Sequence, residues 1–86
     1  MEIQMSFKHM LPSEAVKTHT RDRSEKLKKY FDGKISLNWN FLVDHSGHVA
    51  HCHLIGNHMD FFAEAATEHM TSSIDQAINK LETQIR

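Results

Sequence analysis

The stretch ISLNWNFLVD, from Ile35 to Asp44, decides the fold that this sequence predicts. Its large apolar residues alternate with mostly polar ones, which is the period of a half-buried strand. The apolar face consists of Ile35, Leu37, Trp39, Phe41 and Val43. A shift of one residue would move Trp39 and Phe41 into water, so we expect a strand with a firmly set register.

Three further strands are predicted on either side of this one. Each is a short run in which apolar and other residues alternate, and the runs cover residues 2–8, 48–55 and 60–66. Turn signals separate the last three strands, at His45-Ser46-Gly47 and at Gly56-Asn57. Each strand has one apolar face, which another layer must cover.

Two amphipathic helices complete the pattern. The first is expected to begin after Ser13, a good N-cap, and to run to about Phe31, with Gly33 ending it in a left-handed conformation. Its apolar stripe is thin, because Thr20 and Ser24 interrupt it. The second helix covers residues 70–86, where apolar residues recur at i, i+4 and i+7.

The element order β-α-β-β-β-α predicts an α+β fold of two layers. A strand–helix–strand unit implies a parallel pair between the first two strands, and both helices should cover the same face of one four-stranded sheet. Eighty-six residues leave room for one domain, residues 1–86. The expected core is Ile3, Met5, Phe7, Val16, Leu27, Leu37, Trp39, Phe41, Val43, Leu54, Phe61, Ile74, Ile78 and Leu81.

Positive charge is concentrated between Lys17 and Lys34. This segment holds seven of the ten Lys and Arg residues, although the whole chain has a formal net charge of −1. Such a cationic helix suggests a polyanionic partner. The alternative is a solvated helix face with i,i+4 ion pairs, such as Asp22 with Lys26 and Glu25 with Lys29.

Helical periodicity divides these cations into two flanks of the apolar stripe. At about 100° per residue, Arg23 and Lys26 lie on one flank, beside His19 and Tyr30. The other flank carries Lys17, Arg21 and Lys28. Lys29 should point straight out into solvent.

Several classes of protein do not fit the composition. No apolar run approaches the roughly 20 residues of a membrane span, and the N-terminus lacks the apolar block of a signal peptide. Cys52 is the only cysteine, so no internal disulfide forms, and we expect a cytoplasmic protein with Cys52 in its core. No nucleophile motif is present, which argues against an enzyme.

Eight histidines are unusual in so short a chain. The weak candidates for a transition-metal site are His45, His48, His51 and His53. Their spacing matches no standard zinc pattern, so we expect no metal or other cofactor. Protonated histidines could instead add positive charge at mildly acidic pH and strengthen RNA binding.

The sequence resembles the ribosome hibernation-promoting factor family, also called ribosome-associated inhibitors or sigma-factor modulation proteins. The resemblance rests on EKLKKYFD (residues 25–32), HVAHCHL (residues 48–54), FFAEA (residues 61–65) and HMTSSIDQAINKLETQIR (residues 69–86). It extends over essentially the whole chain. It implies the β-α-β-β-β-α fold, related in layout to double-stranded RNA-binding domains.

The resemblance also implies a function. Members of the family bind the small ribosomal subunit under stress or in stationary phase, occupy the channel of messenger RNA and tRNA, and inhibit translation reversibly. Basic side chains of both helices contact ribosomal RNA. Matching family positions are Lys17, Arg23, Lys26, Lys80 and Arg86, and the full set expected to bind RNA adds Arg21 and Lys28.

The chain departs from the family pattern in its last helix. Thr83 stands where a basic residue is common. We expect no dimerisation domain after Arg86, so the sequence is similar to a short form of the family. Two other functions remain open. One is a protein-interaction module that uses the exposed face or edge of the sheet, and the other is a histidine-rich metal-binding protein.

Overall fold

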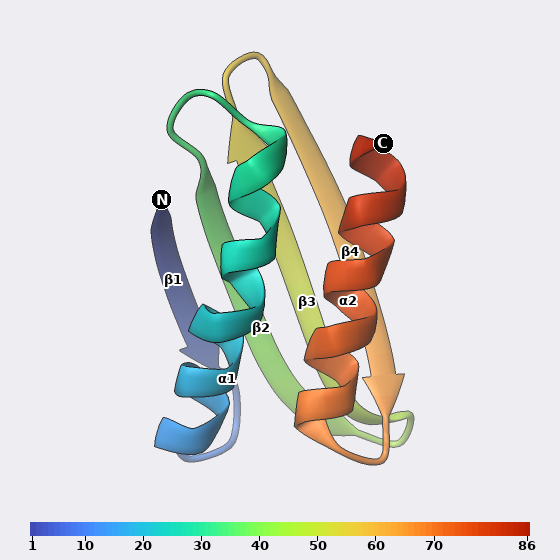
Figure 1. The fold of residues 1–86 in the computed structure, drawn as a ribbon. Helices are drawn as coiled ribbons and strands as arrows, with labels where there is room; N and C mark the ends of the chain where they lie inside the picture. Colours follow the sequence, from blue (N-terminus) through green and yellow to red (C-terminus); the bar gives the residue numbers. More distant parts are fainter.

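The computed structural model describes all residues from 1 to 86. It has a four-stranded sheet with its strands in sequence order, and the helices cover one face of that sheet (Figure 1). The strands are β1 (Glu2–Phe7), β2 (Ser36–Asp44), β3 (Gly47–Gly56) and β4 (Met59–Thr67). The helices are α1 (Glu14–Ser24), its 3₁₀ continuation η1 (Glu25–Tyr30), and α2 (Met70–Ile85). The predicted α+β fold and element order are confirmed.

The pairing of the strands follows the predicted pattern. β1 runs parallel to β2, with Met5 opposite Trp39, and the helix α1 makes the crossover between them. β2 and β3 are antiparallel, which places Trp39 opposite Cys52, and β4 continues the antiparallel order. Every second residue of each strand therefore faces the helices, and Trp39 lies at the centre of that face.

The core lies between the sheet and the helices. Trp39 and Phe41 are buried and stack with 5.8 Å between ring centroids. Thr20 and Ser24, the polar residues in the stripe of α1, are fully buried. Their hydroxyl groups are hydrogen-bonded, as buried polar groups usually are. The Trp39 indole donates to Ser24 Oγ at 3.3 Å, and Thr20 Oγ1 donates to the Val16 carbonyl at 2.7 Å. α2 contributes Met70, Ile74, Ala77, Ile78 and Leu81.

One expected core residue is not in the core. Val43 lies on the helix-facing side of β2, but its side chain is 52% exposed. The neighbouring strand β1 ends at Phe7, which pairs with Phe41, so Val43 extends beyond the part of the sheet that two neighbours support. The periodicity of β2 correctly gives the face of Val43 but cannot give the length of β1.

The first helix begins as predicted and ends differently. The Val16 amide donates to Ser13 Oγ at 3.2 Å, which confirms the N-cap. Residues 25–30 wind as a 3₁₀ helix, and Phe31 then becomes extended, with its amide bonded to the Lys28 carbonyl at 3.1 Å. Gly33 does not adopt the left-handed conformation expected of it, because the tight last turn already closes the helix.

Candidate nucleic-acid interface

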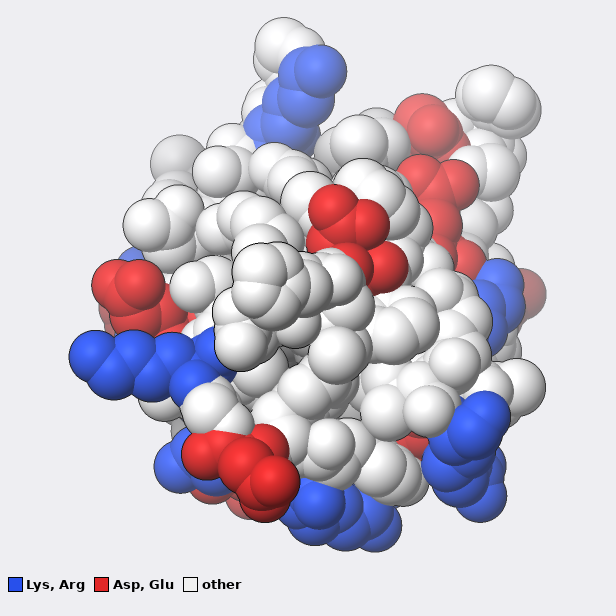
Figure 2. All heavy atoms as spheres, turned by 90° about the horizontal axis from the view of Figure 1, so that it is seen from above, with Lys and Arg blue, Asp and Glu red and all other residues white.

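Charge is distributed unequally between the two layers. The four strands contain no Lys or Arg, and their ionised side chains are the carboxylates of Glu2, Asp44, Asp60 and Glu64. The helical layer carries most of the cations, with carboxylates between them. Figure 2 shows this mixture as blue side chains along the lower rim with red ones among them. An anionic partner would therefore meet attraction on the helical side and repulsion on the sheet side.

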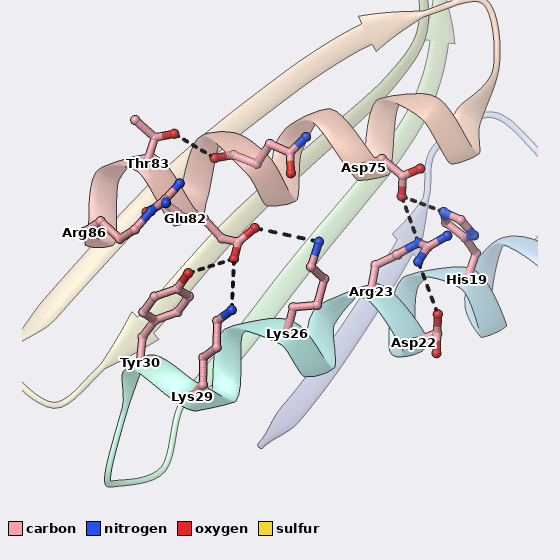
Figure 3. A network of polar contacts seen from close by, with 11 residues as sticks. His19, Asp22, Arg23, Lys26, Lys29, Tyr30, Asp75, Glu82, Thr83 and Arg86 are labelled. Atoms are coloured by element: carbon pink, nitrogen blue, oxygen red, sulfur yellow. Dashed lines mark hydrogen bonds and ion pairs between the residues drawn. The ribbon is translucent and has the colours of Figure 1, made fainter.

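The predicted flank of Arg23 and Lys26 faces α2. Lys29, which was expected to point outward, joins this flank (Figure 3). The reason is the 3₁₀ winding of η1: with three residues per turn, side chains at i and i+3 eclipse, so Lys29 follows the direction of Lys26. The prediction for Lys29 assumed an α-helix throughout and is wrong.

Asp75 of α2 lies opposite the α1 end of this flank. Its Oδ1 is 3.2 Å from Arg23 Nε and 2.8 Å from His19 Nε2. Arg23 also lies 3.7 Å from the exposed carboxylate of Asp22. The side chains of Arg23 and Asp75 are each 44% exposed, so water reaches both partners.

Glu82, two turns further along α2, gathers the side chains of η1. Its carboxylate lies 3.9 Å from both Lys26 Nζ and Lys29 Nζ, and it accepts a hydrogen bond from the Tyr30 hydroxyl at 2.8 Å. This hydrogen bond raises the pKa of Tyr30 above its ordinary value, because the neutral phenol is the form that donates to Glu82. Only 11% of the Glu82 side chain is exposed.

Asp75 and Glu82 were not predicted from the sequence. They lie seven residues apart, which is two helical turns, so both carboxylates project from one side of α2. That spacing was visible in the sequence, but nothing in the sequence showed that this side would face Arg23 and Lys26. The exposed pair of Arg23 with Asp75 contributes at most about 1 kcal/mol, so Arg23 can exchange this carboxylate for a stronger anion.

The second flank of α1 and η1 is paired only locally. Lys17 Nζ lies 3.5 Å from Glu14, and Lys28 Nζ lies 3.2 Å from Glu25. Arg21 makes no ion pair. Glu25 thus pairs at i+3 and not with Lys29 at i+4, again because of the 3₁₀ winding. Water reaches both Lys17, whose side chain is 29% exposed, and Lys28, whose side chain is 55% exposed.

Lys80 of α2 and Arg86 just after it do not line the groove between the helices, whose lining residues are Arg23, Lys26, Asp75, Ile78 and Asn79. Lys80 donates from Nζ to the Glu64 carbonyl at 2.7 Å, and Gln84 donates to the Phe62 carbonyl at 2.5 Å. These side chains cover the outer edge of β4, which would otherwise present unpaired carbonyls. Arg86 Nε lies 3.4 Å from the Glu82 carbonyl, at the end of α2. The structure therefore does not bring Lys80 together with Arg23 and Lys26.

The structure divides the four histidines that are weak metal-site candidates between the two faces of the sheet and a turn. His51 and His53 lie on the open face of the sheet, where His53 stacks on Phe62 at 3.9 Å between ring centroids. His48 lies on the opposite face, because it pairs with Val43, and His45 is in the turn. No group of three or more His, Cys, Asp or Glu residues could hold a metal ion. The pattern of alternation separates the candidates that the sequence places close together.

Two other features bear on function. Cys52 is buried, and desolvation raises the pKa of its thiol to about 12, so it is not a nucleophile at neutral pH. Neither helix is long and apolar enough to cross a membrane.

Fold and surface together define a small α+β domain of two layers whose charged helical layer suits an anionic partner. The family described as Sigma 54 modulation protein / S30EA ribosomal protein matches residues 3–86, and the chain belongs to this family of ribosome-associated proteins.

Solved structures support the fold. The N-terminal domain of Protein Y from Thermus thermophilus is similar with a TM-score of 0.90 and 19% sequence identity, over 99% of this chain and 96% of that one. A ribosomal subunit interface protein from Coxiella burnetii gives a TM-score of 0.85 and 20% identity, over 99% of this chain and 93% of that one. No curated protein matches the sequence.

Proposed function

We propose that this protein binds the small ribosomal subunit in the channel of messenger RNA and tRNA and reversibly inhibits translation during stress or stationary phase. It acts in the cytoplasm by occupying a site and needs no catalytic group. The observation that carries the proposal is the row of Arg23, Lys26 and Lys29 on the side of α1 and η1 that faces α2. The membership of the ribosome-associated family supports it.

The chemistry of the row suits the RNA backbone. Arg23 offers a planar guanidinium that can bind a phosphate through two hydrogen bonds, and Lys26 and Lys29 offer mobile ammonium groups. Asp75, the partner of Arg23, is half-exposed, so a phosphate can displace it at small cost. Lys26 and Lys29 lie 3.9 Å from Glu82, which is too far for a strong hydrogen bond. Lys17, Arg21 and Lys28 on the second flank extend the cationic surface to a neighbouring stretch of the backbone.

The opposite face of the protein supports one orientation on the ribosome. The strands contain acidic residues but no Lys or Arg, so an RNA surface repels the sheet and attracts the helices. Recognition of this kind reads the shape of folded RNA and its phosphates, and it requires no contact with base edges. In the proposed complex Lys80 and Arg86 add contacts at the other side and end of α2.

Charge reversal tests the proposal. The variant Arg23→Glu with Lys26→Glu should lose cosedimentation with small ribosomal subunits at low salt, because two phosphate contacts become repulsive. The matched control is Lys8→Glu with Lys34→Glu, which makes the same change in net charge at exposed residues outside the helices. The control should cosediment like the original protein. Normal cosedimentation of Arg23→Glu/Lys26→Glu, with a folded circular dichroism spectrum, would place the binding site elsewhere.

A further inference from the structure

Asp75 places a carboxylate in the groove that we propose binds phosphate. The groove between α1, η1 and α2 has a volume of about 240 Å³ and is lined by Arg23, Lys26, Asp75, Ile78 and Asn79. Arg23 and Lys26 would attract a phosphate there, and Asp75 would repel it. If phosphate binding were the only task of the groove, an uncharged residue at position 75 would serve better.

The two carboxylates of α2, Glu82 and Asp75, differ in how many hydrogen-bond acceptor positions they leave free for a ligand. Glu82 is almost fully buried and is surrounded by Lys26, Lys29 and Tyr30, so it holds η1 against α2. Asp75 is 44% exposed, and its contacts with His19 and Arg23 both use Oδ1. A carboxylate has about four lone-pair positions for acceptance. Asp75 therefore retains free acceptor positions that face the groove.

A hydrogen-bond donor that lies close to a phosphate would suit the free acceptor positions of Asp75. In RNA the ribose 2′-hydroxyl is such a donor, and in an A-form helix the shallow minor groove displays 2′-hydroxyls between the two rows of phosphates. Carboxylates are known acceptors for ribose 2′-hydroxyls. Asn79 lies in the same groove and can donate to a phosphate or sugar oxygen.

We propose that Asp75 determines specificity for RNA: it accepts a hydrogen bond from a ribose 2′-hydroxyl while Arg23 and Lys26 hold the adjacent phosphate. This proposal rests on the proposed function, because it assigns a task within the same RNA-binding groove. The ribonucleotide satisfies all three side chains at once. A polyanion that lacks a donor at this point leaves Asp75 facing a phosphate, and the repulsion weakens its binding.

The test compares two duplexes that differ only in the donor. One is an RNA duplex of about 16 base pairs, a length that a helical surface of this kind can span, and the other is the same duplex with fluorine in place of each 2′-hydroxyl. Both are A-form, so shape and phosphate spacing are matched. Fluorescence anisotropy at constant salt measures the affinity for each. The original protein should bind the hydroxyl duplex roughly tenfold more tightly, as expected for a hydrogen bond to a charged group.

Three substitutions separate the hydrogen bond from the charge. Asp75→Ala removes the acceptor, so the preference for the hydroxyl duplex should fall to about one, mainly through tighter binding of the fluoro duplex. Asp75→Asn keeps an acceptor oxygen but removes the charge, so its preference should lie between those of the original protein and Asp75→Ala. Glu82→Gln removes one negative charge from the same side of α2 without touching the acceptor, and it should leave the preference unchanged.

Each outcome decides the question. The proposal is wrong if the original protein binds both duplexes equally, if Asp75→Ala retains the preference, or if Glu82→Gln loses it as Asp75→Ala does. Cosedimentation with small subunits, measured on the same proteins, separates the two proposals. An unmodified protein that binds small subunits but does not distinguish the duplexes refutes the role of Asp75 alone. A protein that does not bind small subunits refutes the proposed function.

Discussion

Gly47 stands at a tightly constrained point of the backbone. It begins β3 after the turn at His45 and Ser46, and its φ of 116° lies in a region that side chains other than glycine rarely adopt. A methyl group added there would lie 2.6 Å from the Thr67 carbonyl oxygen of β4. The sequence correctly predicts the turn but not the contact, because the contact depends on how β4 returns to the hairpin.

We expect Gly47→Ala to destabilise the protein by about 1–3 kcal/mol, because the substitution meets both an unfavourable φ and a backbone atom. The measurement is the midpoint of urea unfolding. Gly33→Ala is the matched control, since a methyl group at Gly33 meets nothing within 4 Å and the φ of Gly33 is not positive. The control should be neutral or slightly stabilising. Equal stability of the two variants would contradict this account of the hairpin.

The segment η1 shows how the winding of one element changes the surface. Read as an α-helix, residues 25–30 would pair Glu25 with Lys29 and send Lys29 into solvent. Wound as a 3₁₀ helix, they pair Glu25 with Lys28 and turn Lys29 towards Glu82. Periodicity alone could not find this, because the apolar residues Leu27 and Phe31 suit an α-helix. The structure differs because Phe31 leaves the helix in an extended conformation.

The contact between η1 and α2 predicts a shifted tyrosine titration. Tyr30 is the only tyrosine. Its hydrogen bond to Glu82 raises its pKa above the ordinary value of about 10. The stability that this hydrogen bond contributes is therefore present below pH ~10 and is lost as the pH rises through the folded-state pKa of Tyr30. Glu82→Gln removes the negative charge and should lower the pKa of Tyr30. Near-ultraviolet absorbance of the phenolate measures both proteins. Glu14→Gln, remote from Tyr30, is the control and should titrate like the original. Identical titrations of all three proteins would mean that Tyr30 and Glu82 do not bond in solution.

For the molecule as a whole, the fold could be predicted from the sequence, but the ion pairs between the first helix and α2 could not. Alternation in the strands and the stripe of α2 specify two layers, and the buried positions of Trp39, Phe41 and Leu81 follow from them. The partners of Arg23 and Lys26 depend on which side of α2 faces α1, and that is set by the packing of both helices on the sheet. Local periodicity carries no information about that rotation, so Asp75 and Glu82 were missed.

The most direct test of the central claim is cosedimentation of the unmodified protein with small ribosomal subunits across a salt series. A surface of Lys and Arg that binds RNA phosphates releases counterions, so the logarithm of affinity should fall linearly with the logarithm of salt concentration, by roughly 0.7–0.9 for each phosphate contact. With Arg23, Lys26, Lys29 and one or two cations of the second flank engaged, we predict a slope of about −3 to −4.5. Affinity that does not change between about 50 and 200 mM salt would contradict the account.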